Sequence, residues 1–363
     1  MGLFGKKDLI GLDIGSRTIK AVQLRESGSK WAMVSCGYSE LPEEIFDLSP
    51  IEKKDVLSRE LKNLFKGNNF STKRVAASVS GNSVIVRYVK FPKMSKQDLD
   101  KAIQFEAEPY IPFDIHEVNI GTQILGDVTE EGQPKIETVL VAAKKDILQE
   151  KIEIIQETDL SLSLIDVDAF AIENAFQIQK ELSEETVMLL NIGADTVNMN
   201  ILENGISKVV RDLFIAGNQF TKSIQKNFSV DFKEAERLKR ENGLVIPRQE
   251  EELEEVKMED EDRVNISTVM MVGVRALLGE IERSIEYYQS LKEGGKIDRV
   301  VLSGGSALLK NLDAILSKEL NVPVEIYNPF SNVSGNIDNK YIDLAPMFAV
   351  AVGLATRREG DMK

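Results

Sequence analysis

Two short segments of the sequence share a pattern that suits the binding of phosphate groups. They are residues 13–20 (DIGSRTIK) and 191–196 (NIGADT). In each, a polar residue ends an apolar run and is followed by a tight turn that contains glycine. Such a turn offers backbone N–H groups to an anion, and a carboxylate beside it can hold the anion's metal ion. One copy alone is better interpreted as an ordinary β-hairpin, but two facing copies can hold a polyphosphate from both sides.

A third segment, residues 300–306 (VVLSGGS), is an apolar run that ends in a glycine pair. The pair allows the backbone to approach a flat ligand, and the N-terminus of the helix expected after it favours negative charge. A strand–glycine–helix turn is common in α/β proteins, so this segment indicates a binding site only together with the other two. The sequence contains neither GxxxxGK[ST] nor GxGxxG, which excludes a P-loop and a dinucleotide fingerprint.

The composition of the chain excludes several classes of function. The 363 residues carry a formal net charge of −14, whereas binding to a nucleic acid backbone needs a basic surface, so we expect no nucleic acid partner. With Cys36 and His116 as its one cysteine and one histidine, the chain has no intramolecular disulfide and no Cys/His zinc site. The longest apolar run, residues 347–355, is far shorter than the roughly 20 residues of a membrane-spanning helix, and no secretory signal is recognisable. We therefore expect a cytoplasmic protein without a membrane span.

The segments around the phosphate-binding turns read as strands and helices in α/β order. The first turn lies between strands expected at residues 8–14 and 18–25, and an amphipathic helix begins at Pro50. Residues 12–18 align without a gap with residues 190–196, so the opening hairpin occurs twice. The long interval between the copies indicates a duplicated domain rather than a solenoid.

The duplication predicts an α/β fold of two related domains, with a small α+β unit inserted in the first. An acidic stretch in the second half is expected to be a solvated loop or a frayed helix, with an acidic docking segment as the alternative. The predicted boundaries are 1–81, 161–185 and 346–363 for the first domain, 82–160 for the inserted unit, 186–220 and 296–345 for the second domain, and 221–295 for a mainly helical subdomain with its acidic loop 247–265.

The three segments resemble, in order and spacing, the phosphate-1 loop (13–20), the phosphate-2 loop (191–196) and the adenosine loop (300–306) of the actin-like ATPase superfamily, which includes actin, Hsp70, sugar kinases and FtsA. Within it the chain is similar, over nearly its whole length, to the PilM family of type IV pilus assembly proteins. The segments that carry this resemblance are residues 3–4 (LF), 11–16 (GLDIGS), 106–113 (EAEPYIPF), 216–221 (AGNQFT), 234–239 (EAERLK) and 302–306 (LSGGS).

The resemblance implies an actin-like (ribonuclease-H-like) fold in which two helices, at residues 168–180 and 346–357, connect the halves. Small residues such as Ala171 and Gly353 would let these helices pack closely. It also implies that ATP and Mg²⁺ bind between the domains, with Asp13 near Mg²⁺ through a water molecule. The other implied contacts are with the β-phosphate (Gly15, Ser16, Lys20), the γ-phosphate (Gly193, Asp195, Thr196 and a turn at Gly217), the ribose or adenine (Glu236, Lys239) and the base (Gly304, Gly305, Ser306).

Three of the implied roles have alternatives. The superfamily usually has aspartate at the first phosphate-2 position, where this sequence has Asn191, which adds no negative charge toward Mg²⁺; we therefore expect ATP hydrolysis to be slow at most. Candidates for a catalytic residue that orders water are Asp166 and Asp168, which are equally suited to cap the following helix. Glu236 and Lys239 also have the spacing of a surface ion pair, worth about 0.3 kcal/mol.

The implied function is a nucleotide-binding scaffold of the type IV pilus inner-membrane assembly complex, recruited to the cytoplasmic face of that membrane. The groove between the inserted unit and the first domain would bind the N-terminal cytoplasmic peptide of PilN. Other pilus inner-membrane and motor proteins, and a second copy of the chain, are further expected contacts. Two alternatives are an FtsA-like, filament-forming cell-division ATPase and a small-molecule kinase on the same fold. The kinase needs a carboxylate that faces an acceptor hydroxyl, and the sequence has no clear motif for one.

Overall fold

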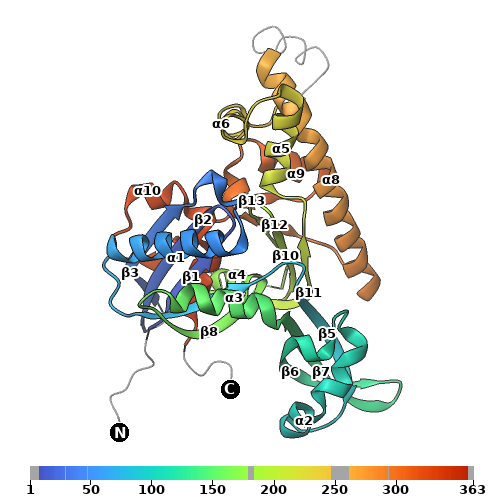
Figure 1. Ribbon diagram of the computed structural model, residues 1–363. Helices are drawn as coiled ribbons and strands as arrows, with labels where there is room; N and C mark the ends of the chain where they lie inside the picture. The colour runs from blue at the N-terminus through green and yellow to red at the C-terminus, as the bar shows by residue number, and fades with distance from the viewer. Residues whose placement is uncertain are drawn as a thin grey trace.

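The computed structural model of the chain has an α/β fold with three β-sheets, as the sequence predicts. Two large sheets have helices between and around them, and the third sheet lies in a smaller unit at the lower right of Figure 1. The residues that the structure describes are 8–28, 30–46, 48–178, 184–246, 261–292 and 294–358.

The first large sheet has the strand order β14-β3-β2-β1-β4-β8. The first three strands along the chain are antiparallel, whereas β4 pairs in parallel with β1, and β8 in parallel with β4. Helix α1 (Pro50–Lys66) begins after Ser49, whose hydroxyl accepts a hydrogen bond from the N–H of Glu52 in a capping box. The strands are Ile10–Ile14 (β1), Thr18–Ser27 (β2), Lys30–Glu40 (β3), Arg74–Val79 (β4), Ser161–Val167 (β8) and Val333–Ser334 (β14).

The second large sheet repeats this arrangement, in the order β11-β10-β9-β12-β13. Again three antiparallel strands come first, and two strands parallel to the first of them follow. Apart from the additional edge strand β14, the strand order in the two sheets is therefore the same, which confirms the duplication inferred from the aligned turns. The strands are Thr186–Ile192 (β9), Val197–Glu203 (β10), Ile206–Leu213 (β11), Arg299–Ser303 (β12) and Val324–Ile326 (β13).

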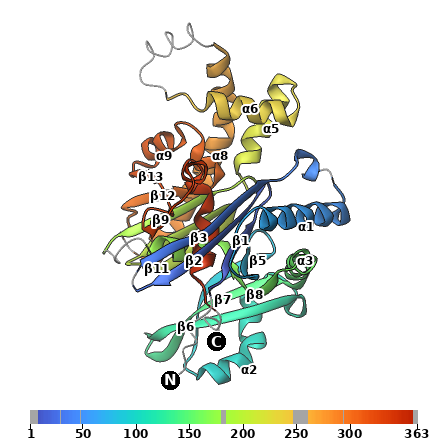
Figure 2. The ribbon, with the colours of Figure 1, turned by 90° about the vertical axis from the view of Figure 1, so that its left-hand side faces the viewer.

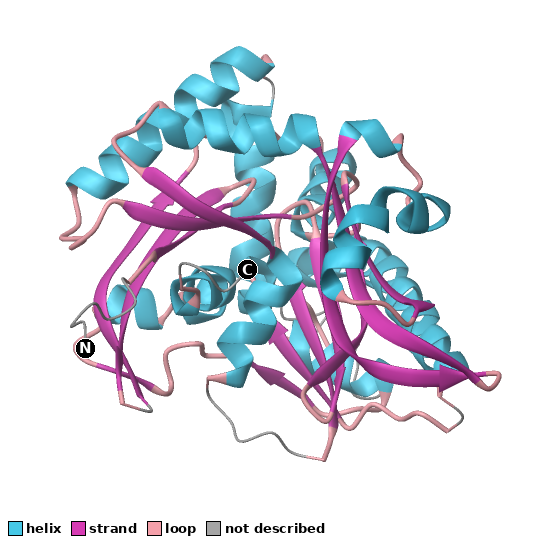
Figure 3. Cartoon of the chain, turned by 90° about the horizontal axis from the view of Figure 1, so that it is seen from below, coloured by secondary structure: helices cyan, strands magenta, loops and turns pink. Residues whose placement is uncertain are grey.

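Two short helices, α4 (Asp168–Gln177) and α11 (Ala349–Thr356), pack together in the core that both large sheets share. Seen from below, helices occupy the middle of the molecule, with strands on both sides (Figure 3). At Gly353 of α11 a Cβ atom would overlap the carbonyl oxygen of Ala171, and at Gly11 of β1 it would overlap that of Ala351. The close packing of the connecting helices, expected from their small residues, is therefore confirmed.

One edge of the first sheet comes from a segment predicted to lie in the second domain. Val333 and Ser334 of β14 pair in parallel with Trp31 and Ala32, so the chain returns to the first sheet before the predicted residue 346. The short elements not yet named are helix α10 (Asn339–Ile342) and 3-10 helices at Glu43–Phe46, Glu108–Tyr110, Ile115–Glu117, Gly305–Leu308 and Ala345–Phe348.

A group of helices lies beyond the second sheet, at the top of Figure 1; its bounds are Gly217–Phe228 (α5), Phe232–Asn242 (α6), Glu261–Leu291 (α8) and Leu312–Leu320 (α9). Among the described helices, α8 is the one long and apolar enough to cross a membrane. Half of its most apolar window is buried, and Met270, Val274 and Ile281 pack with Phe220 in the core of the second domain. We therefore interpret α8 as a core helix.

The acidic segment 247–265 is only partly described. Helix α8 begins at Glu261, so residues 261–265 are helical and not part of a loop as predicted. Residues 247–260 lie outside the described residues.

The inserted unit contains a sheet in the order β5-β7-β6 and helix α2, and Figure 2 shows it below the first sheet. Its own core includes Phe91, Leu99 and Leu140. The unit ends earlier than the predicted residue 160, because Ile154 and Ile155 of α3 pack in the core of the first sheet with Leu61 of α1. The bounds are Val84–Pro92 (β5), Lys96–Ala107 (α2), Val118–Glu130 (β6), Gln133–Lys144 (β7) and Lys145–Gln156 (α3).

The glycine contact between α4 and α11 generates a stability prediction. We expect Gly353→Ala to lower the free energy of unfolding by about 3 kcal/mol, because the new methyl group meets a backbone atom that cannot rotate away. The matched control is Gly279→Ala in α8, where no atom lies within 4 Å of the added Cβ. There alanine should stabilise the helix by about 0.5–1 kcal/mol. Urea unfolding measures both, and equal stability of the two variants would contradict the close contact.

Candidate functional site

A cavity of about 720 Å³ is lined by residues from both halves of the molecule. It brings together, from five separate segments of the chain, every residue that the sequence predicts to contact a nucleotide. These are Asp13, Gly15, Ser16, Lys20, Asn191, Gly193, Asp195, Thr196, Gly217, Glu236, Lys239, Gly304, Gly305 and Ser306.

The two phosphate loops have the same backbone geometry. In the phosphate-1 loop the N–H of Gly15 donates to the carbonyl oxygen of Thr18 at 3.0 Å. In the phosphate-2 loop the N–H of Gly193 donates to the carbonyl oxygen of Thr196 at 2.9 Å. Each loop connects the first two antiparallel strands of its sheet, so the duplication places two equivalent turns at one cavity.

Glycine at positions 217 and 304 lets backbone segments meet at the cavity. A Cβ on Gly217 would lie 2.7 Å from Oγ of Ser306, whose hydroxyl donates to the carbonyl oxygen of Gly193 at 3.2 Å. Gly304 has φ +86°, in the region that favours glycine, and a Cβ there would overlap the carbonyl oxygen of Ile192. The adenosine loop and the start of α5 therefore pack directly on the phosphate-2 loop.

Asp13 and Lys20 form an ion pair inside the cavity. Nζ of Lys20 lies 2.9 Å from Oδ2 of Asp13 and donates to Oγ1 of Thr18 at 2.9 Å. The two side chains are 14% and 8% exposed. The carboxylate of Asp13, predicted to lie near Mg²⁺, and the ammonium of Lys20, predicted to contact phosphate, neutralise each other. A ligand that separates this pair must offer a cation to Asp13 and an anion to Lys20.

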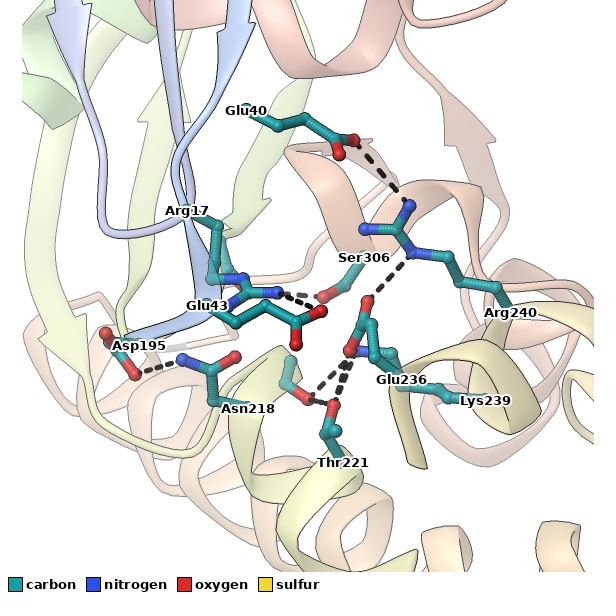
Figure 4. A network of polar contacts seen from close by, with 12 residues as sticks. Arg17, Glu40, Glu43, Asp195, Asn218, Thr221, Glu236, Lys239, Arg240 and Ser306 are labelled. Atoms are coloured by element: carbon teal, nitrogen blue, oxygen red, sulfur yellow. Dashed lines mark hydrogen bonds and ion pairs between the residues drawn. The ribbon is translucent and has the colours of Figure 1, made fainter. Parts of the chain in front are cut away.

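Glu236 and Lys239 form an ion pair at 2.6 Å, but the predicted alternative of a surface pair is wrong, because their side chains are only 14% and 11% exposed. Figure 4 shows that Thr221 contacts both of them, and that Arg240 extends from Glu236 toward Glu40 of the first domain. Burial opposes ionisation of Glu236, but the charge of Lys239 and these hydrogen bonds hold its pKa at about 2. Burial lowers the pKa of Lys239 despite the neighbouring carboxylate.

Two contacts join the first domain to α6 at the cavity. The guanidinium of Arg17 lies over the ring of Phe232 at 4.9 Å, and that of Arg240 lies 3.8 Å from a carboxylate oxygen of Glu40. Arg17 and Arg240 were not among the predicted site residues, although Arg17 lies within the phosphate-1 loop. Both line the cavity, and each is also paired with a carboxylate, Arg17 with Glu43 and Arg240 with Glu236.

Of the two candidate catalytic acids, Asp168 lines the cavity and Asp166 does not. Asp166 is buried and paired with Arg357 at 3.2 Å. Neither acid caps α4 as the alternative predicted, because the N-cap residue is Val167 and it has no side-chain cap hydrogen bond. Burial and the charge of Asp13 raise the pKa of Asp168, against hydrogen bonds from serine hydroxyls that include Ser80 at 2.6 Å.

Lys151 of α3 also lines the cavity, and sequence analysis missed it. Its Nζ donates to the carbonyl oxygen of Ile14 at 3.4 Å, and burial lowers its pKa although Asp168 and Asp13 favour the charged form. The sequence signal was hidden, because this lysine lies in an amphipathic helix that was predicted to belong to the inserted unit.

Asn198 and Asp212 are further polar residues that sequence analysis missed. Asn191 donates to Asn198, and Asn198 donates to Asp212, each at 2.9 Å. Asp212 also accepts the N–H of Gly81, next to the inserted unit, at 2.6 Å. Burial raises the pKa of Asp212 against these two hydrogen bonds. The available signal was the pair of asparagines between the apolar residues of strand β10.

The oxygen atoms of the cavity fit Mg²⁺ that arrives with a nucleotide. Among the described residues no group of three or more His, Cys, Asp or Glu side chains could hold a metal ion alone. Asp13, Asp168 and Asn191 nevertheless offer carboxylate and amide oxygens to the cavity. Mg²⁺ typically keeps several waters and is bound by one or two carboxylates together with the phosphates of its nucleotide. This donor set therefore fits a magnesium–nucleotide complex better than a free metal ion.

Comparisons with known proteins agree with this architecture. A chain of the PilM–PilN type IV pilus biogenesis complex is 25% identical and superimposes with a TM-score of 0.81, over 97% of this chain and 98% of that one. MreB5 of Spiroplasma citri, solved with ADP, has a TM-score of 0.50 at 13% identity over 96% and 94%. The ethanolamine utilization protein EutJ of Carboxydothermus hydrogenoformans has 0.53 at 12% identity over 98% and 91%. These likenesses confirm the actin-like fold.

Sequence relatives point to the same superfamily and to one family within it. FtsA of Buchnera aphidicola is 30% identical over 159 residues, which cover 40% of this chain and 38% of FtsA. The curated relatives are thus matched over less than half of their length. The family described as "Type IV pilus assembly protein PilM" matches residues 11–359. This match covers almost the whole chain, and the protein therefore belongs to the PilM family of type IV pilus assembly proteins.

Proposed function

We propose that this protein binds ATP with Mg²⁺ and serves as a scaffold in type IV pilus assembly by binding the N-terminal cytoplasmic peptide of PilN. The observation that carries the proposal is the pair of equivalent glycine turns, one from each half, that line one cavity. In this proposal the protein works at the cytoplasmic face of the inner membrane, where it also contacts other pilus inner-membrane and motor proteins or a second copy of itself.

The charges and backbone groups at the cavity support binding of a nucleotide. Backbone N–H groups at glycine turns and the charged group of Lys20 suit phosphate oxygens. Asp13 would hold Mg²⁺ through water, and the metal, when bound, neutralises charge on the phosphates. In this proposal the buried pair of Glu236 and Lys239, which lines the cavity, contacts the ribose or adenine, and the adenosine loop borders the base.

The phosphate contact of Lys20 generates the first binding prediction. Lys20→Ala should raise the Kd for magnesium–ATP roughly 10- to 150-fold, which corresponds to the loss of one charge-assisted hydrogen bond of about 1.5–3 kcal/mol. Calorimetry measures the change. The control is Lys73→Ala, because Lys73 is 69% exposed and pairs with Asp159 outside the cavity. Unaltered protein that binds neither ATP nor ADP would remove the nucleotide part of the proposal.

Hydrolysis is proposed to be slow, because Asn191 is neutral and the cavity offers Asp168 as the best-placed residue to order a water. We expect a kcat below about 1 s⁻¹, the lower end of the usual enzyme range. Asp168→Asn should abolish the residual phosphate release and leave ATP binding measurable, since asparagine retains an oxygen that can accept from the Ser80 hydroxyl. A coupled phosphate assay measures the unaltered protein and the variant, and turnover of several per second in the unaltered protein would contradict this part.

The inserted unit is proposed as the partner site because its sheet has an open edge. In the described part of the chain, β6 pairs with β7 on one side and with no strand on the other. An extended peptide can add to such an edge through main-chain hydrogen bonds, while alternate side chains enter pockets. The similarity to a chain solved in a PilM–PilN complex supports PilN as the source of the peptide.

Removing the inserted sheet tests the partner site. The ends of the unit are adjacent, since the N–H of Lys144 donates to the carbonyl oxygen of Ser83 at 2.9 Å, so a short Gly-Ser linker can replace residues 84–144. We expect the shortened chain, which keeps Lys151, to bind ATP but not the PilN peptide. Fluorescence anisotropy with a labelled peptide measures this. The control is a peptide with its apolar residues changed to serine, which should not bind the intact protein. Equal peptide binding by both chains would place the partner site elsewhere.

The two alternative functions are less well supported. FtsA is matched over 40% of this chain, whereas the PilM family covers residues 11–359. A small-molecule kinase needs a base that faces an acceptor hydroxyl. Asp168 lines the cavity and could take that role, but the family match is to type IV pilus assembly proteins. A screen for ADP release with sugars as acceptors distinguishes the kinase from the scaffold.

A further inference from the structure

A row of four polar side chains crosses the second sheet beside the phosphate-2 loop. Asp212 of β11, Asn198 of β10, Asn191 of β9 and Ser303 of β12 are successive cross-strand partners. Cross-strand partners point to the same face of a sheet. Leu189, two residues from Asn191 on β9, packs in the core shared with the first sheet, so this face is directed toward the first domain. Asn191 and Asn198 line the cavity.

The hydrogen bonds along this row all run in the same direction. Oγ of Ser303 donates to Oδ1 of Asn191 at 3.2 Å, and Nδ2 of Asn191 donates to Oδ1 of Asn198 at 2.9 Å. Nδ2 of Asn198 then donates to Oδ1 of Asp212 at 2.9 Å. The second carboxylate oxygen of Asp212 accepts the N–H of Gly81 at 2.6 Å.

The carboxylate at the end of the row determines this direction. An ionised carboxylate can only accept hydrogen bonds, whereas an amide group can present either its oxygen or its NH₂. Asp212 therefore requires the NH₂ of Asn198, which turns the Asn198 oxygen toward Asn191. Asn191 must therefore direct its own NH₂ group toward the Asn198 oxygen, because two facing oxygens repel. Its oxygen is left on the side of Ser303, next to the adenosine loop.

We propose that Asp212 is a positioning residue of the nucleotide site, which acts through Asn198 to make Asn191 present its carbonyl oxygen and not its NH₂ group. This inference rests on the proposed function. Oxygen is the ligand and hydrogen-bond acceptor that hydrated Mg²⁺ prefers, and an NH₂ group in its place would repel the cation. The neutral Asn191 thus offers the same kind of atom as an aspartate, while the negative charge lies two strands away at Asp212.

Moving the negative charge along the row, from position 212 to position 191, tests this role. In Asp212→Asn the new amide can donate to Asn198, which reverses the row and turns the NH₂ of Asn191 outward. In Asn191→Asp, carboxylates face Asn198 from both sides, and its single oxygen must point at one of them. In the double variant the reversed row is consistent again, because Asn198 donates to position 191 and accepts from position 212.

Two properties are measured for the unaltered protein, the two single variants and the double variant. The first is the Kd for ATP by calorimetry, with Mg²⁺ and with EDTA, and the second is the melting temperature without nucleotide. Asp212→Asn should reduce the gain in ATP affinity from Mg²⁺ by about tenfold, the size of one good hydrogen bond. Asn191→Asp should lower the melting temperature by about 2–4 °C. The double variant should recover both properties.

A residue outside the row provides the control. Asn200 lies on the same face of β10 but donates to Glu173 of α4 at 3.1 Å. Asn200→Ala combined with Asp212→Asn should give the sum of the two single effects, because no hydrogen bond links these positions.

The outcomes separate the inference from the proposed function. If the double variant shows only the sum of its two single effects, the row has no direction and Asp212 is structural. If the unaltered protein binds no ATP in either buffer, the proposed function fails and the nucleotide role of Asp212 with it. ATP binding together with recovery in the double variant supports both.

Discussion

The spacing between the two halves of the molecule depends on contacts between backbone atoms. At Gly353 and at Gly11 no side-chain atom separates the neighbouring segments, so α11 lies directly against α4 and β1. Side chains can repack, but backbone atoms cannot, which makes this distance hard to alter. The cavity depends on it, because each phosphate loop follows the first strand of its own sheet. The distance between the two phosphate loops therefore depends on α4 and α11, although neither helix contains one of the glycine turns.

The buried charges of the cavity are already paired before any ligand is considered. Lys20 lies against Asp13, Lys239 lies against Glu236, and burial favours the neutral forms of Lys151 and Asp168. Such pairs are stable only while both partners are satisfied. A polyanion without a bound cation would pair with Lys20 and leave the buried negative charge of Asp13 without a partner. A polyanion that brings its own cation can satisfy both groups, which favours magnesium–ATP over ATP alone.

The sequence predicts the features that lie within one short segment, but not the contacts that depend on how the strands pair. The glycine turns, the duplicated hairpin and the small residues of the connecting helices could be predicted because the chain repeats them or spaces them visibly. Asn198 and Asp212 could not be connected to Asn191, because cross-strand partners in a row are set by the pairing of β9, β10 and β11. The boundary of the inserted unit was misplaced because the apolar face of α3 does not reveal which sheet it covers. Asp166 and Asp168 are two residues apart, and only the structure shows that one pairs with Arg357 while the other lines the cavity.

The adjacent ends of the inserted unit have a consequence for how the chain folds. β4 and β8 pair directly, yet the inserted unit and α3 separate them in sequence. If the inserted sheet, residues 84–144, were a disordered loop of about 60 residues, closing it would cost roughly 3–4 kcal/mol of chain entropy. A unit with its own core, whose first and last strands pair as Val84 does with Ala143, closes that loop by itself. Strands β4 and β8 can then pair as if the chain between them were short.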